Sequence, residues 1–185
     1  MPSIAYFEDV VAFAKKYNIE YKEKELTPEE VAAQNDRESM FVLNDFAQKY
    51  FADILWNNQE GRSVGLSYFK ERGFRDDIIE KFGLGYSLDS WDALAVAAKA
   101  KGYKQEYLEK TGLSYMSDKG KMTDRFRGRV IFPVHTITGK VVAFGGRVLK
   151  TNDKTAKYVN SPESEIYHKS NELYGIYFAK NAIIK

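Results

Sequence analysis

Apolar residues in the first third of the chain recur every three or four positions. They predict a helix over Tyr6–Tyr17 and a helix with a wide apolar stripe from Met40 to about Trp56. Between them, Thr27-Pro28-Glu29-Glu30 combines a capping threonine, a proline at the first helical position and a glutamate three residues after the cap. The sequence therefore predicts a helix start at Pro28.

Glycine follows each of four shorter helical runs. Because glycine takes up the backbone conformation that ends a helix, these runs predict four short helices rather than one long one. The runs are LSYFKER before Gly73, DDIIEKF before Gly83, SWDALAVAAKAK before Gly102 and QEYLEKT before Gly112.

After Gly112 the pattern becomes typical of strands. RVIFPVH and KVVAFGGRVL are rich in β-branched and aromatic residues and flank Thr136-Ile137-Thr138-Gly139, which predicts an antiparallel hairpin. We interpret the following polar segment, KTNDKTAKYVNSPESEIYHK, as a loop and expect the tail to end in a helix. Helices before strands predict an α+β fold, with a helical body packed on a small curved antiparallel sheet.

Composition excludes several kinds of chemistry. The 185 residues include no cysteine, so there is no disulfide, thiolate zinc site or cysteine nucleophile, and the two histidines alone make a poor metal site. Glu163 and Glu165 are too few to hold two metal ions, so we predict no metal site. No apolar stretch is long enough to span a membrane, and we expect a cytoplasmic protein.

The net charge is +2, but the basic and acidic residues are unevenly distributed along the chain. From Lys119 to Lys157 there are ten basic and two acidic residues, which leaves eighteen basic and twenty-four acidic residues elsewhere. Within this band, Arg125, Arg127 and Arg129 alternate, so an extended segment would point them to one face, with Arg147 nearby on the partner strand. Guanidinium groups suit phosphate, and the pattern predicts a basic face of the sheet that binds a polyanion, although a solvated arginine face stays an alternative.

The same residues carry a resemblance to a known family. DRFRGRVIFPVHTITGKVVAFGGRVL, followed by AKYVNSPESEIYHKSNELYGIYFAKNAI, closely resembles the amino-terminal subdomain of the catalytic core of bacterial DnaG-type DNA primases. YFKERGFRDDIIEKFGLGYS and SWDAL look like the helical part of that subdomain. The resemblance covers residues 37–185, which we expect to stop before the TOPRIM subdomain. Residues 1–36 resemble the last helix and exit linker of the family's zinc-binding domain.

This resemblance implies RNA primer synthesis in DNA replication, a DNA-directed RNA polymerase and nucleotidyltransferase activity of the whole protein. Mg²⁺ in the TOPRIM subdomain would activate the 3′-hydroxyl and the ribonucleoside triphosphate, and Zn²⁺ would lie in the amino-terminal domain. We expect this fragment alone to be inactive and to hold neither metal. A carboxy-terminal domain would contact the replicative helicase in the primosome.

The resemblance also implies roles for nine residues. One group corresponds to family positions that contact single-stranded DNA template, and a second would line the path of the nucleotide and the RNA primer. The first group is Arg72, Arg147 and Lys157, and the second is Arg125, Arg127, Arg129, Tyr158, Asn160 and Lys169.

Two other functions remain open from the sequence. The chain could be a stand-alone, non-catalytic module that binds single-stranded nucleic acid, because it has no cluster of metal-binding carboxylates. It could also be an interaction domain that docks a partner through its aromatic helices. The two differ in whether neutralising Arg125, Arg127 and Arg129 impairs DNA binding.

Overall fold

The computed structural model describes residues 27–149 and 156–183. The predicted helix over Tyr6–Tyr17 lies outside these residues. The chain divides into two units, one ending at Gln34 and the other running from Asn35 to Lys185. All nine predicted site residues belong to the second unit, and the domain boundary predicted at residue 36 stays a prediction.

Helix α2 spans Pro28–Asn57 and begins where the sequence predicts. The Glu30 backbone N–H donates to Thr27 Oγ1 at 3.2 Å, and the Thr27 N–H donates to Glu30 Oε2 at 2.9 Å. This reciprocal pair satisfies two amide groups that a helix start leaves without partners. The predicted apolar stripe is buried, including Met40, Leu43 and Phe51.

The four predicted short helices are present, and each is followed by a glycine with positive φ, between 59° and 86°. They are α3 (Ser67–Glu71), α4 (Asp76–Lys81), α5 (Ala93–Ala100) and α6 (Gln105–Lys110). The π-helix η1 (Gly61–Leu66), which leads directly into α3, was not predicted from the sequence. A Cβ on Gly61 would lie 1.8 Å from the carbonyl oxygen of Ile54, so only glycine fits this close approach to α2.

The main sheet has four antiparallel strands in the order β1-β4-β5-β6. The predicted hairpin is confirmed, and β2 and β3 form a second, two-stranded sheet. Strand β6 lies in a segment that we predicted to be a loop. The sequence does not reveal this strand, because it is a three-residue edge strand without an alternating apolar pattern. The strands are β1 (Gly85–Ser87), β2 (Ser114–Met116), β3 (Met122–Asp124), β4 (Arg129–His135), β5 (Val141–Val148) and β6 (Tyr158–Asn160).

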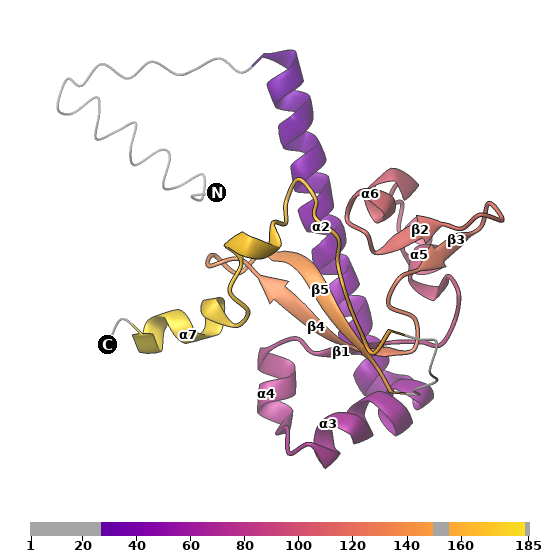
Figure 1. Ribbon diagram of the computed structural model, residues 1–185, viewed down its shortest axis with the longest axis vertical. Helices are drawn as coiled ribbons and strands as arrows, with labels where there is room; N and C mark the ends of the chain where they lie inside the picture. Colours follow the sequence, from indigo (N-terminus) through magenta and orange to yellow (C-terminus); the bar gives the residue numbers. More distant parts are fainter. Residues whose placement is uncertain (1–26, 150–155, 184–185) are drawn as a thin grey trace. The chain divides into compact units, whose positions relative to one another are not determined.

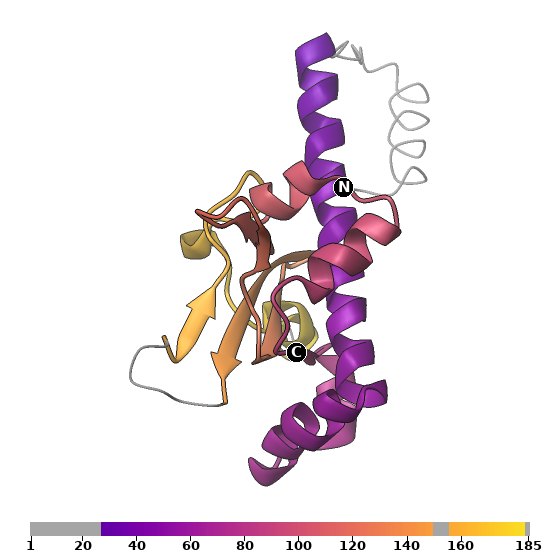
Figure 2. The ribbon, with the colours of Figure 1, turned by 90° about the vertical axis from the view of Figure 1, so that its right-hand side faces the viewer.

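Helices cover both faces of the main sheet (Figures 1 and 2). On the α2 face, Ile131 and Phe144 pack against the long helix, and the Phe51 ring meets the Phe144 ring edge to face at 5.6 Å. On the opposite face, which we call the α3 face, Phe132 contacts Phe69 of α3 in the same way at 5.7 Å. The predicted α+β fold is therefore confirmed, with helices on two sides of the sheet.

The carboxylate of Asp124 ties three elements together. It accepts hydrogen bonds from the backbone N–H groups of Leu94 at 2.7 Å and Ala95 at 3.2 Å, and from Ser114 Oγ at 2.9 Å. A side chain from β3 thus caps the start of α5, where Asp92 makes no capping bond. Burial raises the pKa of Asp124, and the three hydrogen bonds oppose this rise by stabilising its charged form.

Helix α7 (Ile176–Ile183) confirms the predicted helical tail and packs on the β4–β5 hairpin. Its Tyr177 ring stacks on His135 at 5.9 Å between centroids, and its Phe178 ring meets the same imidazole edge to face at 5.1 Å. The Lys180 ammonium donates to the carbonyl oxygen of Ile137 in the hairpin turn at 2.9 Å. Burial lowers the pKa of His135, which favours the neutral imidazole in its packing against Tyr177 and Phe178.

We predict that Asp124→Ala destabilises the protein by about 2–4 kcal/mol, because two buried amides and a hydroxyl lose their acceptor. Urea denaturation of the 185-residue chain measures the change. Asp118→Ala, at an exposed position of the β2–β3 turn, is the matched control and should change stability by less than about 0.5 kcal/mol. Equal effects of the two substitutions would contradict the capping role.

We also predict that acid weakens the packing around His135. Because the folded pKa lies below the ordinary value of 6.5, the unfolded chain takes up the proton first as the pH falls. The stabilisation is complete above pH 6.5 and is lost as the pH drops from there toward the folded pKa. The urea midpoint should therefore fall more steeply between pH 7 and 5 in the natural chain than in His135→Gln. Parallel pH profiles would rule this out.

Candidate nucleic-acid interface

The arginine-rich segment is a turn and not an extended strand. Residues 125–128 connect β3 to β4, and Gly128 has a φ of 63°. The Phe126 ring between the arginines is buried in the core. The prediction that Arg125, Arg127 and Arg129 share one face is therefore wrong, since the alternation of an extended strand does not apply inside a turn.

Arg129 is buried, with only 6% of its surface exposed. It packs against Gly146, and its Nη1 donates to the carbonyl oxygen of Lys157 at 3.3 Å. Burial lowers the pKa of its guanidinium. The prediction that Arg129 adds to the surface next to Arg147 is wrong because of the register. Val130, and not Arg129, lies opposite Arg147, so the two arginines point to opposite faces of the sheet.

Arg147 lies on the α3 face between two tyrosines. Its Nη1 donates to the Tyr68 hydroxyl at 2.5 Å, and its Cζ is 5.1 Å from the Tyr68 ring centroid and 5.6 Å from that of Tyr158. The guanidinium carbon of Arg72, at the end of α3, lies 4.9 Å from the centroid of the same Tyr68 ring. Two arginines thus share one tyrosine in cation–π contacts.

Strand β6 adds further predicted residues to this cluster. Tyr158 pairs with Arg147, and Asn160 pairs with Gly145, so both side chains point to the α3 face. Asn160 Oδ1 lies 3.2 Å from where a Cβ on Gly145 would stand, so the bare glycine leaves room for the amide. The Lys157 ammonium lies 6.0 Å from the Tyr158 ring. We call this cluster the tyrosine–arginine ridge; it comprises Tyr68, Arg72, Arg147, Lys157, Tyr158 and Asn160.

In the part of the chain that the structure describes, the cations of the ridge have no carboxylate partners. Among residues 27–149 and 156–183, no ion pair involves Arg72, Arg147 or Lys157. The Nε of Arg147 is buried and has no hydrogen-bond partner there. Tyr158 is 60% exposed. This combination offers phosphate oxygens a set of cations and offers an unpaired base an aromatic ring.

Arg125 and Arg127 make separate contacts away from the ridge. The Arg127 Cζ lies 3.5 Å from the ring centroid of Trp91, and its Nε is 3.3 Å from Asp89 Oδ1. Arg125 Nε donates to the carbonyl oxygen of Gly112 at 2.7 Å, and its Cζ lies 5.7 Å from the Tyr115 ring. The band from Lys119 to Lys157 has few acids of its own, but Asp89, from a distant part of the sequence, pairs with Arg127.

Lys169, the last of the predicted residues, lies in the 3₁₀ turn η2 (Lys169–Asn171) and is exposed. Its backbone N–H donates to Glu163 Oε1 at 3.0 Å, and the other oxygen of Glu163 is 3.1 Å from His168 Nδ1. No hydrogen bond or ion pair joins the Lys169 side chain to the ridge within the described residues. The same part of the chain contains no group of three or more histidines and carboxylates able to hold a metal.

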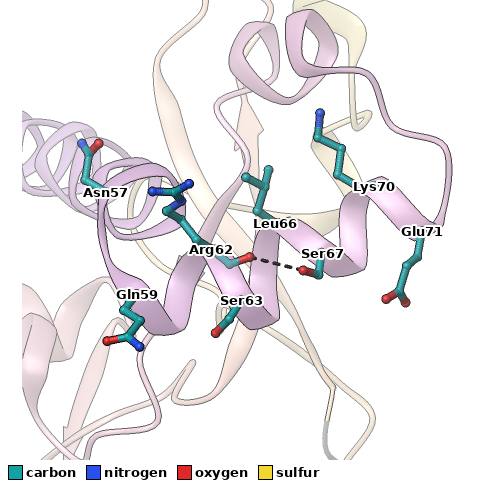
Figure 3. A pocket seen from close by; sticks show the side chains of 8 residues that line it. All are labelled: Asn57, Gln59, Arg62, Ser63, Leu66, Ser67, Lys70 and Glu71. Carbon is teal, nitrogen blue, oxygen red and sulfur yellow. Dashed lines mark hydrogen bonds between the residues drawn. The ribbon is translucent and has the colours of Figure 1, made fainter.

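A hollow of about 670 Å³ lies beside η1 and α3 (Figure 3). There the Ser67 hydroxyl donates to the carbonyl oxygen of Arg62 at 3.4 Å, five residues earlier, within the wide π-helical turn. Tyr68 and Arg72 do not line this hollow. Arg62, Lys70 and the carboxylate Glu71 line it, and Lys70 is paired with Asp76.

Two aromatic residues that organise the arginines were not predicted from the sequence. Tyr68 precedes Arg72 by four residues, the spacing at which side chains meet on a helix, and this signal could have linked them. The sequence pattern placed Trp91 in a helical run. In the structure it lies before α5, which begins at Ala93, and it is 65% exposed. The sequence could not show that Tyr68 also contacts Arg147 or that Trp91 contacts Arg127, because both contacts join distant parts of the chain.

Comparisons with known proteins agree with this architecture. Residues 50–180 match the family model of the DNA primase catalytic core, N-terminal domain. The DNA primase of Halalkalibacterium halodurans is 39% identical over 181 residues, which is 97% of this chain and 29% of that protein. The chain thus belongs to the DNA primase family and spans under a third of the length of this relative.

Solved structures give the same result at the level of the fold. The RNA polymerase domain of Mycobacterium tuberculosis primase DnaG is 37% identical, with a TM-score of 0.74, and the match covers 80% of this chain and 47% of that one. A DnaG primase catalytic domain bound to single-stranded DNA is 33% identical, with a TM-score of 0.71 over 80% of this chain and 47% of that one.

The described residues contain no helix that is both long enough and apolar enough to cross a bilayer.

We predict that the hydrogen bond from Arg129 to the Lys157 carbonyl oxygen stabilises the pairing of β6 with β5. Arg129→Met removes the donor to the Lys157 carbonyl, a charge-assisted bond worth about 1.5 kcal/mol, and should speed amide exchange in β6 about tenfold. Hydrogen exchange of residues 158–161 measures this, and Arg129→Lys should have a smaller effect. Arg75→Met, at an exposed surface position, serves as the control. Unchanged exchange in Arg129→Met would refute the supporting role.

Proposed function

We propose that this chain is the template-binding part of a DNA primase and that its tyrosine–arginine ridge binds single-stranded DNA. The observation that carries the proposal is the cluster of Arg72 and Arg147 around Tyr68, in a chain of the primase family, without ion pairs in the described residues. The DnaG structure bound to single-stranded DNA is that of a protein with the same fold.

The chemistry of the ridge suits a single strand better than a duplex. Arginine binds phosphate oxygens with two parallel N–H groups, whereas a tyrosine ring stacks on a base of any sequence. Arg147 is held between Tyr68 and Tyr158, so little side-chain entropy is lost when its remaining N–H groups bind phosphate. Lys157 and Asn160 extend the polar surface along β6. Binding should therefore tolerate any sequence and weaken with salt.

The whole protein's activity follows from family membership and is part of this proposal. It would join ribonucleoside triphosphates into an RNA primer on the DNA template, in the cytoplasm and next to the replicative helicase. Arg125, Arg127 and Lys169 would line the path of the nucleotide and primer. Mg²⁺ held by the TOPRIM subdomain would polarise the triphosphate, and Zn²⁺ would belong to the zinc-binding domain. The alternative of a stand-alone binding module is not favoured, because the relatives are DNA primases.

We predict that neutralising the ridge reduces both the affinity for single-stranded DNA and its salt dependence. Removing one cation that binds a phosphate should lower the slope of log binding constant against log salt by about 0.7. Arg72→Gln, Arg147→Gln and Lys157→Gln should each reduce the slope in anisotropy titrations of a labelled oligothymidylate by up to this amount.

Arg75→Gln is the matched control, since Arg75 is exposed, lies three residues after Arg72 and is bound to Asp77 through both Nε and Nη2. It should leave the slope unchanged. If the natural chain binds no oligothymidylate at low salt, or if Arg75→Gln and Arg147→Gln have equal effects, the proposed function is wrong.

A further inference from the structure

We propose that Ser161 is a positioning residue of the tyrosine–arginine ridge. Its buried hydroxyl ends strand β6 at Asn160 and thereby sets the directions of the Asn160 amide and the Tyr158 ring. The inference rests on the proposed function, because it concerns the site that would bind single-stranded DNA. It goes beyond that function by assigning the arrangement of the site to a side chain that lies beneath its surface.

The pairing of β5 with β6 ends in an unusual hydrogen bond. The Val148 N–H donates to the Lys157 carbonyl oxygen at 3.0 Å, and the Ser161 N–H donates to the Phe144 carbonyl oxygen at 2.9 Å. In a regular antiparallel pair, the Phe144 N–H would donate to the carbonyl oxygen of Ser161. It donates instead to Ser161 Oγ at 3.0 Å. The hydroxyl takes the place of the backbone carbonyl, so the chain can leave the sheet at this residue.

Burial gives this hydrogen bond its importance. Ser161 is 8% exposed and Phe144 is 1% exposed, so the bond lies in the protein interior. A buried N–H that loses its acceptor costs more free energy than the bond itself contributes. Because both residues are buried, water does not readily replace the hydroxyl. The Ser161 side chain therefore determines how the strand ends.

Pro162 fixes the direction in which the chain leaves the sheet. Proline has no N–H and restricts the residue before it to extended conformations, so Ser161 does not continue into a helical turn. The Pro162 ring lies against Gly112, where a Cβ would stand 2.2 Å from Pro162 Cδ. Gly112 also has a φ of 67°, so glycine is required there. The segment after β6 is therefore docked at a defined point, just after α6.

The same junction relates the ridge to Arg125. The Gly112 carbonyl oxygen accepts a hydrogen bond from Arg125 Nε at 2.7 Å. Pro162 and Arg125 therefore meet on one glycine. Through this glycine, the end of β6 keeps a constant separation from Arg125, which we place on the path of the nucleotide and primer.

Asn160 and Tyr158 depend on where β6 ends. The hydrogen bonds of Lys157 and Ser161 with β5 imply, by alternation, that the backbone groups of Tyr158 and Asn160 point away from β5. The bonds of their neighbours therefore hold these two residues in place. Without the Ser161 hydroxyl, Asn160 would lie at the frayed end of a three-residue strand.

A measurement without DNA tests the positioning directly. In the 185-residue chain, Ser161→Ala should lower the NMR order parameter of the Asn160 backbone N–H from the rigid value of about 0.85 toward the flexible range below about 0.6. Ser161→Thr keeps the hydroxyl and should restore the rigid value. Ser164→Ala is the matched control, because Ser164 lies in the same segment and its Oγ accepts a longer bond, from the Ile166 N–H at 3.4 Å.

DNA affinity then shows whether Ser161 acts through the ridge. In anisotropy titrations with a labelled oligothymidylate, Ser161→Ala should weaken binding roughly 3- to 10-fold, because Asn160 and Tyr158 must be ordered on binding. The salt slope should stay unchanged, since no charge is removed. In the background of Tyr158→Ala with Asn160→Ala, adding Ser161→Ala should weaken binding by less than about twofold, because the groups that it positions are gone.

The outcomes distinguish this inference from the proposed function. An Asn160 order parameter that Ser161→Ala does not change would overturn the inference and leave the ridge proposal intact. Equal weakening by Ser161→Ala in the natural chain and in the double-variant background would also overturn it, because a general loss of stability acts equally in both. If the natural chain binds no oligothymidylate, the proposed function is overturned, whereas a lowered order parameter in Ser161→Ala would still support the positioning of Asn160 by Ser161.

Discussion

The pairing of β4 with β5 determines which arginines can reach a ligand. Cross-strand partners point to the same face, so the partnership of Val130 with Arg147 places Arg147 on the α3 face beside Tyr68. The same register places Arg129 on the other face, where it is buried and supports β6. A shift of one residue would exchange these two environments. The ridge therefore depends first on a backbone register and only second on the basic composition of the segment.

Much of the fold could be predicted because its signals are local. The Thr27–Glu30 capping pair, the apolar stripe of α2, the glycines after the short helices and the β4–β5 hairpin each depend on neighbouring residues. The missed elements are short or stabilised by distant partners. Strand β6 exists because its backbone pairs with β5, and η1 accommodates the close approach of Gly61 to α2. Three-residue strands and wide helical turns leave almost no periodic pattern.

The site was predicted less well, for an electrostatic reason. Asp124 is the acid nearest the arginines in the sequence, yet its carboxylate caps α5, and Asp89 instead pairs with Arg127. The expected single basic face became a ridge and a separate arginine–tryptophan contact. Arg72, Arg147, Lys157, Tyr158 and Asn160 nevertheless lie together, although the resemblance assigned the first three to the template and the last two to the path of the nucleotide and primer. Their chemical types could be read from the sequence, but their tyrosine partner Tyr68 required the fold.

The π-helical turn before α3 sets the rotational phase of the ridge. An ordinary helix advances about 100° per residue, so the widened turn of η1 rotates everything after it relative to α2. Tyr68 and Arg72 follow this turn directly, and their direction toward Arg147 is inherited from it. Removing one residue from η1 would preserve every side chain of the ridge and still turn two of them away from the others. The spatial arrangement of the cluster thus depends on a segment that contributes no side chain to it.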